Sequence, residues 1–183
     1  QIVGTIEVII YFITVNHMAL KSLSGKIALV TGAGQNIGRG IALSLSASGA
    51  IIVVNGRDNE GLVSETVAEI KKNGGNAVGY MADIADPISV KTLIDKIKSD
   101  LGGLDILICN AGLRRQTKFL DMSFSEWREI LSVALDGAFL LTKAAVPLLM
   151  DRGGGSIVAL SGISHHIGTV NRCHVSASKA GLE

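Results

Sequence analysis

The sequence has few cysteines, few aromatic side chains and almost no net charge, and these shortages exclude several classes of protein. Its two cysteines, Cys109 and Cys173, are too few for a disulfide framework, so we expect two free thiols in a reducing cytoplasm. The formal net charge of +1 argues against nucleic acid and against a membrane surface as partners. No residues have metal-ligand spacing, and His165 and His166 would point to opposite sides of an extended segment, so we predict no metal site.

The sequence also lacks an initiating methionine, and its first apolar run is too short to cross a bilayer. Its first apolar run, residues 2–15, covers about 14 residues, whereas a spanning helix needs ~20. A signal peptide would begin with basic residues and carry a small-residue cleavage site, and both are missing here. A conventional soluble sequence starts at Met18. We therefore interpret residues 1–17 as translated upstream sequence or a fragment artefact, with a membrane anchor as the alternative.

Apolar residues and glycine are abundant instead. Hydrophobic residues make up 48% of the 183 residues against 18% charged, and there are 22 glycines. This composition suits an α/β protein whose sheet is covered by helices on both faces. The length is sufficient for one domain with a sizeable core and too short for two comfortable ones.

From Lys26 onward, short apolar strands alternate with amphipathic helices. We expect Asp86 and Ser123 to cap two of these helices, and a last helix to have begun by Ser176. Regular βαβ units predict a doubly wound parallel sheet flanked by helices, with the ligand at the carboxyl ends of the strands. The expected strands are residues 27–30, 51–55, 77–81, 104–109 and 156–161.

A glycine loop between the first strand and its helix is the clearest motif. Gly32, Gly34 and Gly38 have no Cβ atom, so the backbone N–H groups near the helix N-terminus can approach a phosphate closely. Small or polar residues also follow the other expected strands, as a dinucleotide crevice requires. These strand ends are residues 55–58, 83–84, 110–112 and 161–164.

Five short motifs stand out along the chain: residues 31–38, 83–84, 110–112, 155–158 and 176–181. Together they resemble the short-chain dehydrogenase/reductase family. The resemblance covers residues 18–183 as an NAD(P)-binding Rossmann domain, with the C-terminal part of the family missing. It implies hydride transfer between a carbonyl and an alcohol of a small-molecule substrate, a nicotinamide cofactor, and a homotetramer or dimer when full length.

The resemblance also assigns cofactor contacts. Asp83 is similar to the family's contact to the adenine ring, residues 110–112 to its ribose lining, and Lys179 to the lysine that holds the nicotinamide ribose. Asn36 stands where the family usually has glycine, a mild change because asparagine tolerates a left-handed backbone. The expected cofactor-binding residues are Gly32, Gly34, Gln35, Asn36, Ile37, Gly38, Arg57, Asp83, Ile84, Asn110, Ala111, Gly112 and Lys179.

The end of the second strand favours NADP over NAD. An acidic side chain there would accept hydrogen bonds from a ribose 2′-hydroxyl and repel a 2′-phosphate. The sequence has Gly56 at that position, followed by Arg57, whose planar fork can pair with a phosphate. Asp58 opposes this choice, and Arg57 as a solvated surface charge is the alternative.

The catalytic positions depart from the family pattern. Val175 replaces the tyrosine four residues before Lys179, Gly162 replaces the serine after the fifth strand, and Ala134 replaces the asparagine of the long helix. Lys179 is the one catalytic position retained. Ser161 and Ser164 flank Gly162 and are candidates for its role.

A histidine could supply the missing proton. His174 precedes Val175 and titrates in a useful range, although five residues along a helix turn it away from the face of Lys179. His165 and His166 are further candidates. The Arg114-Arg115 pair could meet an anionic substrate or lie in a solvated loop. Two functions stay open: an oxidoreductase with an altered proton relay, and a non-catalytic protein that binds the dinucleotide as a sensor or structural relative.

Overall fold

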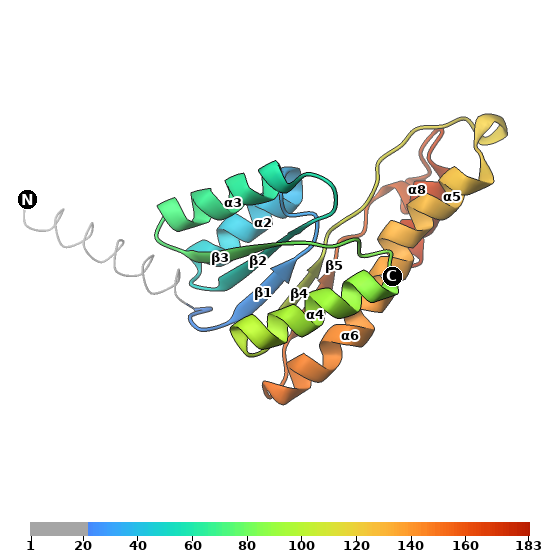
Figure 1. Ribbon diagram of the computed structural model, residues 1–183. Helices are drawn as coiled ribbons and strands as arrows, with labels where there is room; N and C mark the ends of the chain where they lie inside the picture. The colour runs from blue at the N-terminus through green and yellow to red at the C-terminus, as the bar shows by residue number, and fades with distance from the viewer. Residues whose placement is uncertain (1–21) are drawn as a thin grey trace, which may run out of the picture.

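The computed structural model describes residues 22–183, so the interpretation of residues 1–17 lies outside the described part of the chain. Five parallel strands form one sheet in the order β3-β2-β1-β4-β5, flanked by helices (Figure 1). This confirms the predicted Rossmann-type doubly wound fold. The strands are β1 (Ile27–Val30), β2 (Ile51–Gly56), β3 (Asn76–Met81), β4 (Ile106–Cys109) and β5 (Ser156–Ala159).

Strand β1 lies at the centre of the sheet and is buried along its whole length. Its Ala28 pairs with Ile52 of β2 on one side and with Ile106 of β4 on the other. Strand order reverses across this strand, since the chain moves outward through β2 and β3 and then crosses back to β4. Such a switch point is where open parallel sheets bind their ligands.

Helices cover both faces of the sheet (Figure 1). Helices α2 (Asn36–Ala47) and α3 (Glu60–Lys72) lie on one face, and α4 (Pro87–Leu101) and α6 (Gly137–Asp151) on the other. Side chains of β1 alternate between the two cores: Val30 packs toward α2 and α3, and Leu29 toward α4 and α6. The remaining elements are η1 (Phe119–Asp121), α5 (Phe124–Leu131), η2 (Ser132–Asp136), α7 (Ser164–Ile167) and α8 (Cys173–Ala180).

Side-chain caps start three of the helices. The Asp86 carboxylate accepts from the Ser89 N–H at 2.8 Å, and the Ser123 hydroxyl accepts from the Glu126 N–H at 3.1 Å, as predicted from the sequence. Asn59 caps α3 by accepting from the Leu62 N–H. Each cap satisfies an N–H group that has no partner within its helix.

Three features of the fold were not expected. The long helix after Ser123 contains a π-helical turn, η2, between α5 and α6. The short helix α7 occupies part of the segment between β5 and α8, for which only a strand end had been predicted. Strands β4 and β5 are also shorter than predicted: β4 starts at Ile106 and β5 ends at Ala159.

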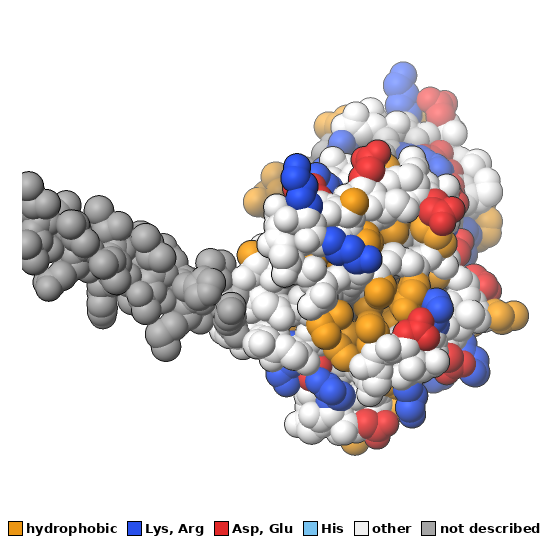
Figure 2. Space-filling model, turned by 60° about the vertical axis from the view of Figure 1, so that its left-hand side comes forward, with side chains coloured by type: hydrophobic (Ala, Val, Ile, Leu, Met, Phe, Trp, Pro, Cys, Tyr) orange, Lys and Arg blue, Asp and Glu red, His pale blue; other side chains and the backbone are white. Residues whose placement is uncertain are grey.

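Among residues 22–183, one helical stretch, Phe124–Asp151, is long and apolar enough to cross a membrane by length and composition alone. Leu141, Ala145 and Leu148 on this stretch are buried in the core cluster that includes Leu29 and Leu107 of the sheet. It is therefore a core helix. On the face shown in Figure 2, acidic and basic side chains are interspersed around a hydrophobic area.

Candidate functional site

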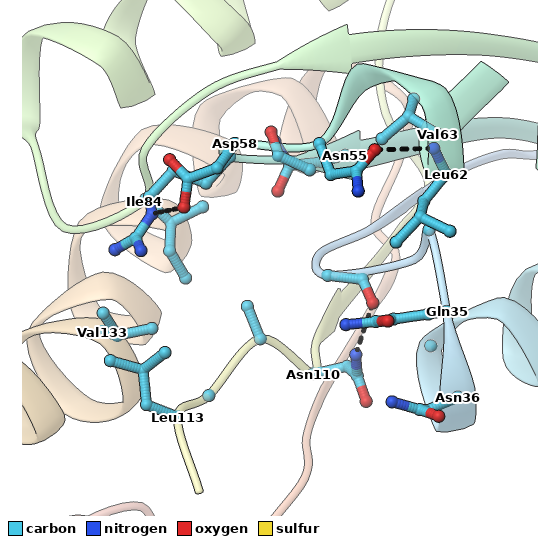
Figure 3. A pocket seen from close by; sticks show the side chains of 18 of the residues that line it. Gln35, Asn36, Asn55, Asp58, Leu62, Val63, Ile84, Asn110, Leu113 and Val133 are labelled. Atoms are coloured by element: carbon cyan, nitrogen blue, oxygen red, sulfur yellow. Dashed lines mark hydrogen bonds and ion pairs between the residues drawn. The ribbon is translucent and has the colours of Figure 1, made fainter.

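A crevice of about 960 Å³ lies at the carboxyl ends of β1, β2 and β4 (Figure 3). Its lining includes every residue predicted to bind the cofactor except Lys179. Gln35, Asn36 and Asn110 lie together on the side of the glycine loop, and Ile84, Leu113 and Val133 line the opposite side. The crevice therefore has a polar side formed by the loop and an apolar side formed by helical and loop residues.

The glycine loop needs its glycines for backbone conformation and for close approach. Gly32 has a φ of +61°, and a Cβ atom on Gly38 would lie 2.4 Å from the Gly32 carbonyl oxygen. Asn36 has a φ of +51°, so the asparagine adopts the left-handed conformation that the sequence predicted it could tolerate. Helix α2 begins at Asn36, and Gln35 before it makes no side-chain cap, so the first N–H groups of the helix are not capped by that side chain.

Asn110 connects β4 to the glycine loop. Its Nδ2 donates to the Thr31 carbonyl at 2.8 Å and to the Gly32 carbonyl at 3.3 Å. The Thr31 hydroxyl in turn accepts from the backbone N–H groups of Asn110 and Ala111. These contacts brace the loop against the neighbouring strand.

The end of β2 has no room for an acidic side chain. A Cβ atom on Gly56 would lie 2.5 Å from Cγ2 of Val63. The next residue, Arg57, lines the crevice and donates from Nε to Asp58 at 2.7 Å. This hydrogen bond to Asp58 raises the pKa of Arg57 above its ordinary value, and the guanidinium remains a cation at the rim of the crevice.

Asp83 and Ile84 follow β3 in the same crevice. The Asp83 carboxylate accepts from the Ala85 N–H at 2.9 Å, and its backbone N–H donates to the Ser89 hydroxyl at 3.0 Å. Ile84 is buried and packs against Gly137, where a Cβ would lie 2.9 Å from Cδ1 of Ile84. Asp83 is thus fixed by local hydrogen bonds and Ile84 by packing.

The sequence prediction missed five apolar residues of the crevice. Their positions on α3, after β3, on the loop after β4 and in the π-helical turn follow from tertiary packing, and a periodic apolar pattern does not separate a crevice residue from a core residue. They are Leu62, Val63, Ala82, Leu113 and Val133.

Lys179 lies on α8 beside the loop after β4. Its ammonium donates to the Leu160 carbonyl just after β5, and a Cβ on Gly112 would lie 3.7 Å from Nζ. Burial lowers the pKa of Lys179, and the positive charge of Arg114 lowers it further. Lys179 is therefore next to the crevice wall without being part of its lining.

The two replaced positions, Val175 and Gly162, and the serine candidates lie around α8 in different environments. Val175 is buried, and Gly162 lies against the Lys179 side chain. The Ser161 hydroxyl donates to the Lys179 carbonyl at 3.2 Å, whereas the Ser164 carbonyl accepts from the Ser176 hydroxyl. The serine contacts hold α8 against the segment after β5.

Ala134 and His174 lie on elements that pack against each other. Ala134 is buried in η2, and such π-helical turns are frequent at functional sites. The His174 side chain is fully buried, and its Nε2 lies 3.3 Å from Oε1 of Glu126 on α5. Glu126 also accepts from the Thr117 hydroxyl, so His174 connects α8 to α5 and to the loop after β4.

The predicted arrangement of His165 and His166 was wrong. The two residues lie in the helical turn α7 and not in an extended segment, and their ring centroids are 3.8 Å apart. A helical backbone separates neighbouring side chains by about 100°, whereas an extended one separates them by about 180°. Both rings can therefore approach one group, Glu183.

Both cysteines are free thiols, as predicted. Cys109 at the end of β4 is buried, and burial raises the pKa of its thiol to about 11. Cys173 at the start of α8 is exposed. The Cys109 thiol therefore stays protonated at neutral pH.

Comparison with known proteins places this crevice in a large family. A family model of the short chain dehydrogenases matches residues 26–183. The chain is 34% identical over 163 residues to a 3-oxoacyl-[acyl-carrier-protein] reductase of Synechocystis, covering 89% of this chain and 66% of the relative. It is 33% identical over 164 residues to a 2-dehydro-3-deoxy-D-gluconate 5-dehydrogenase of Formosa agariphila, covering 90% of this chain and 62% of the relative.

A solved structure agrees with these sequence matches. A short-chain type dehydrogenase/reductase from Mycobacterium marinum superposes with a TM-score of 0.84 at 35% identity, covering 89% of this chain and 67% of that one. The chain thus spans about two thirds of the length of the relatives it matches. On its sequence, its sheet order and its crevice, the chain belongs to the short-chain dehydrogenase/reductase family.

Proposed function

We propose that this protein is an NADP-dependent oxidoreductase that transfers hydride between a carbonyl and an alcohol of a small molecule. The observation that carries the proposal is the crevice, which gathers the glycine loop, Arg57, Asp83 and Asn110 at the carboxyl ends of neighbouring strands. A nicotinamide cofactor would supply the hydride. The glycine loop would hold its pyrophosphate at the start of α2.

Preference for NADP is supported by two residues at the end of β2. Gly56 leaves no space for a carboxylate that would bind a ribose 2′-hydroxyl, and Arg57 faces the crevice with a permanent positive charge. Asp58 occupies one nitrogen of Arg57, Nε, and the two terminal nitrogens of the fork remain for a phosphate.

Lys179 is the residue that we propose to act in proton transfer. Reduction of a carbonyl needs a proton at the oxygen when hydride reaches the carbon. The Lys179 ammonium can donate a proton, and its lowered pKa makes that donation easier near neutral pH. His174, Ser161 and Ser164 are secondary candidates, although the His174 ring is fully buried against Glu126.

A non-catalytic dinucleotide-binding protein is the second candidate. It is favoured by the residues at three positions where the family has catalytic side chains: Val175, Gly162 and Ala134. A valine, a glycine and an alanine can neither donate nor accept a proton through their side chains. A sensor or structural relative would need the crevice and no proton relay.

We propose a cytoplasmic protein without nucleic acid or membrane as partners, because the net charge is close to zero and the two thiols are free. A homotetramer or dimer is what the family resemblance implies for the full-length protein.

Turnover distinguishes the two candidates. NADPH oxidation by the protein should be followed with a panel of ketones and aldehydes, beside calorimetric titration of NADPH. Oxidation above the rate of a Lys179→Ala variant supports the oxidoreductase. Tight NADPH binding without any oxidation supports the non-catalytic protein, and absence of NADPH binding contradicts both.

A further inference from the structure

Two histidines and a carboxylate converge outside the crevice, next to α8. The Nε2 atoms of His165 and His166 lie 3.0 and 3.4 Å from the same oxygen, Oε2 of Glu183. One possible ligand atom from each of the three residues lies within 4.8 Å of the other two. None of the three residues lines the crevice, so this cluster is separate from the proposed dinucleotide site.

The buried ring nitrogens of His165 lack hydrogen-bond partners within the described residues. Its side chain is 8% exposed, and neither ring nitrogen forms a hydrogen bond within the described part of the chain. Glu183 comes near one of them, Nε2, without forming a hydrogen bond to it. Leaving a buried polar group without a partner costs about 1–3 kcal/mol, and an ion is one of the partners that account for such groups.

The spacing of the cluster fits a small transition metal. Zinc binds imidazole nitrogen at about 2.0–2.1 Å and carboxylate oxygen at about 2.0–2.2 Å, so neighbouring tetrahedral ligands lie roughly 3.3–3.5 Å apart. The distances of 3.0 and 3.4 Å from Oε2 of Glu183 are close to that range. Small movements of exposed Glu183 and His166 would complete the geometry.

The donor atoms select the class of metal. Two imidazoles and one carboxylate are a common set for zinc with an open fourth position, whereas calcium and magnesium prefer oxygen ligands throughout. We propose that His165, His166 and Glu183 form a site for a divalent transition metal such as zinc, open to water or a further ligand at the remaining position.

This site would join two segments of the fold. His165 and His166 belong to α7, and Glu183 follows α8. At present α7 and α8 are connected by the hydrogen bond from the Ser176 hydroxyl to the Ser164 carbonyl. A bound metal would cross-link the same two segments. Because it would bind the folded arrangement of its ligands and not the unfolded chain, zinc should also raise the free energy of unfolding.

Zinc titration of the 183-residue chain tests the proposal. Affinity is measured by competition with a chromophoric chelator, with Co²⁺ absorption as a second readout of tetrahedral coordination. His165→Ala, His166→Ala and Glu183→Gln should each weaken zinc binding by at least about tenfold, because loss of an outer-shell partner alone typically costs 10–100-fold. Circular dichroism on every variant establishes that the fold is retained.

Two control variants test whether zinc binds at this cluster and not elsewhere on the protein. Cys173→Ser removes the exposed thiol that could bind zinc elsewhere, and Glu65→Gln removes an exposed carboxylate on α3; both should keep the wild-type affinity. Wild-type zinc binding no tighter than that of His165→Ala would overturn the proposal and leave a simple His–Glu ion pair. Loss of zinc binding in Cys173→Ser would also overturn it. Dinucleotide binding plays no part in either outcome.

Discussion

The Asn110 side-chain amide donates to the Thr31 carbonyl at 2.8 Å and so fixes the glycine loop to the end of β4. The same amide reaches the Gly32 carbonyl, and the Thr31 hydroxyl accepts two backbone N–H groups from the β4 side. The loop is therefore positioned by a neighbouring strand before any phosphate binds. Such preorganisation lowers the cost of ordering the loop on binding.

Replacing Asn110 should weaken dinucleotide binding. Asn110→Ala removes the donor to Thr31 and Gly32, and we expect about tenfold weaker NADPH binding, equivalent to about 1.4 kcal/mol. Asn110→Asp keeps the shape but cannot donate, so it should lose at least as much. Calorimetric titration measures both, and wild-type affinity in Asn110→Asp would contradict the bracing role.

A pair of glycine variants separates loop geometry from helix propensity. Gly38→Ala would place a Cβ 2.4 Å from the Gly32 carbonyl oxygen, so we expect a loss of about 1–3 kcal/mol in the free energy of unfolding, with weaker NADPH binding. Gly40→Ala lies two residues further along α2, where an added Cβ would meet no atom within 4 Å. That variant should gain up to about 1 kcal/mol, because alanine is the better helix former. Urea unfolding measures both, and equal effects of the two substitutions would contradict this account.

Asp105 makes the free energy of unfolding depend on pH in the acidic range. Its nearly buried carboxylate accepts from the Ile27 N–H at 2.9 Å and pairs with Arg152 and Lys26. Burial alone would raise the pKa of Asp105, but these three donors outweigh it and the pKa is lowered. The carboxylate therefore stabilises the fold above its unfolded pKa of about 3.9, and this contribution is lost as the pH falls through the lower folded value.

Asp105→Asn should thus cost about 1–2 kcal/mol of unfolding free energy at pH 7, since it removes the charge-assisted bonds to Arg152 and Lys26, whose partly exposed cations can be solvated instead. The difference between wild type and variant should shrink as the pH falls below about 4. Denaturant unfolding at several pH values measures it. A difference that stays constant down to pH 2 would show that the charge of Asp105 is not responsible.

Introducing the tyrosine that the family resemblance implies tests the proposed proton relay. Val175→Tyr, combined with Gly162→Ser, supplies a hydroxyl four residues before Lys179 and another after β5. General acid catalysis is typically worth about 10²–10⁴ in rate, so carbonyl reduction by the double variant should rise by at least tenfold. Steady-state NADPH oxidation measures it against the single variants. An unchanged rate, with NADPH binding intact, would show that proton supply is not what limits the wild-type protein.

The sequence was sufficient to predict the sheet and most of the crevice. Apolar runs such as residues 27–30, and caps such as Asp86 and Ser123, are local signals, and the structure has them where they were expected. The glycine loop was predictable because Gly32 and Gly38 meet a steric demand that other residues cannot satisfy.

Other features depend on contacts that the sequence pattern does not carry. The π-helical turn keeps the apolar spacing of an ordinary helix, so nothing local marked Val133 as part of the crevice. Helix α7 has only four residues and no side-chain cap, so it gave no start signal, and the position of His165 and His166 was predicted wrongly. The meeting of α7 with Glu183 is a tertiary contact.

Comparative titration with NADPH and NADH tests whether the crevice binds a dinucleotide and whether Arg57 selects the 2′-phosphate. Calorimetry on the wild type should give NADPH binding at least about tenfold tighter than NADH binding, since Arg57 would make a charge-assisted bond worth about 1.5–3 kcal/mol with the 2′-phosphate. Arg57→Ala should abolish that preference and leave NADH affinity unchanged. Tighter binding of NADH than NADPH by the wild type, or binding of neither, would contradict the account.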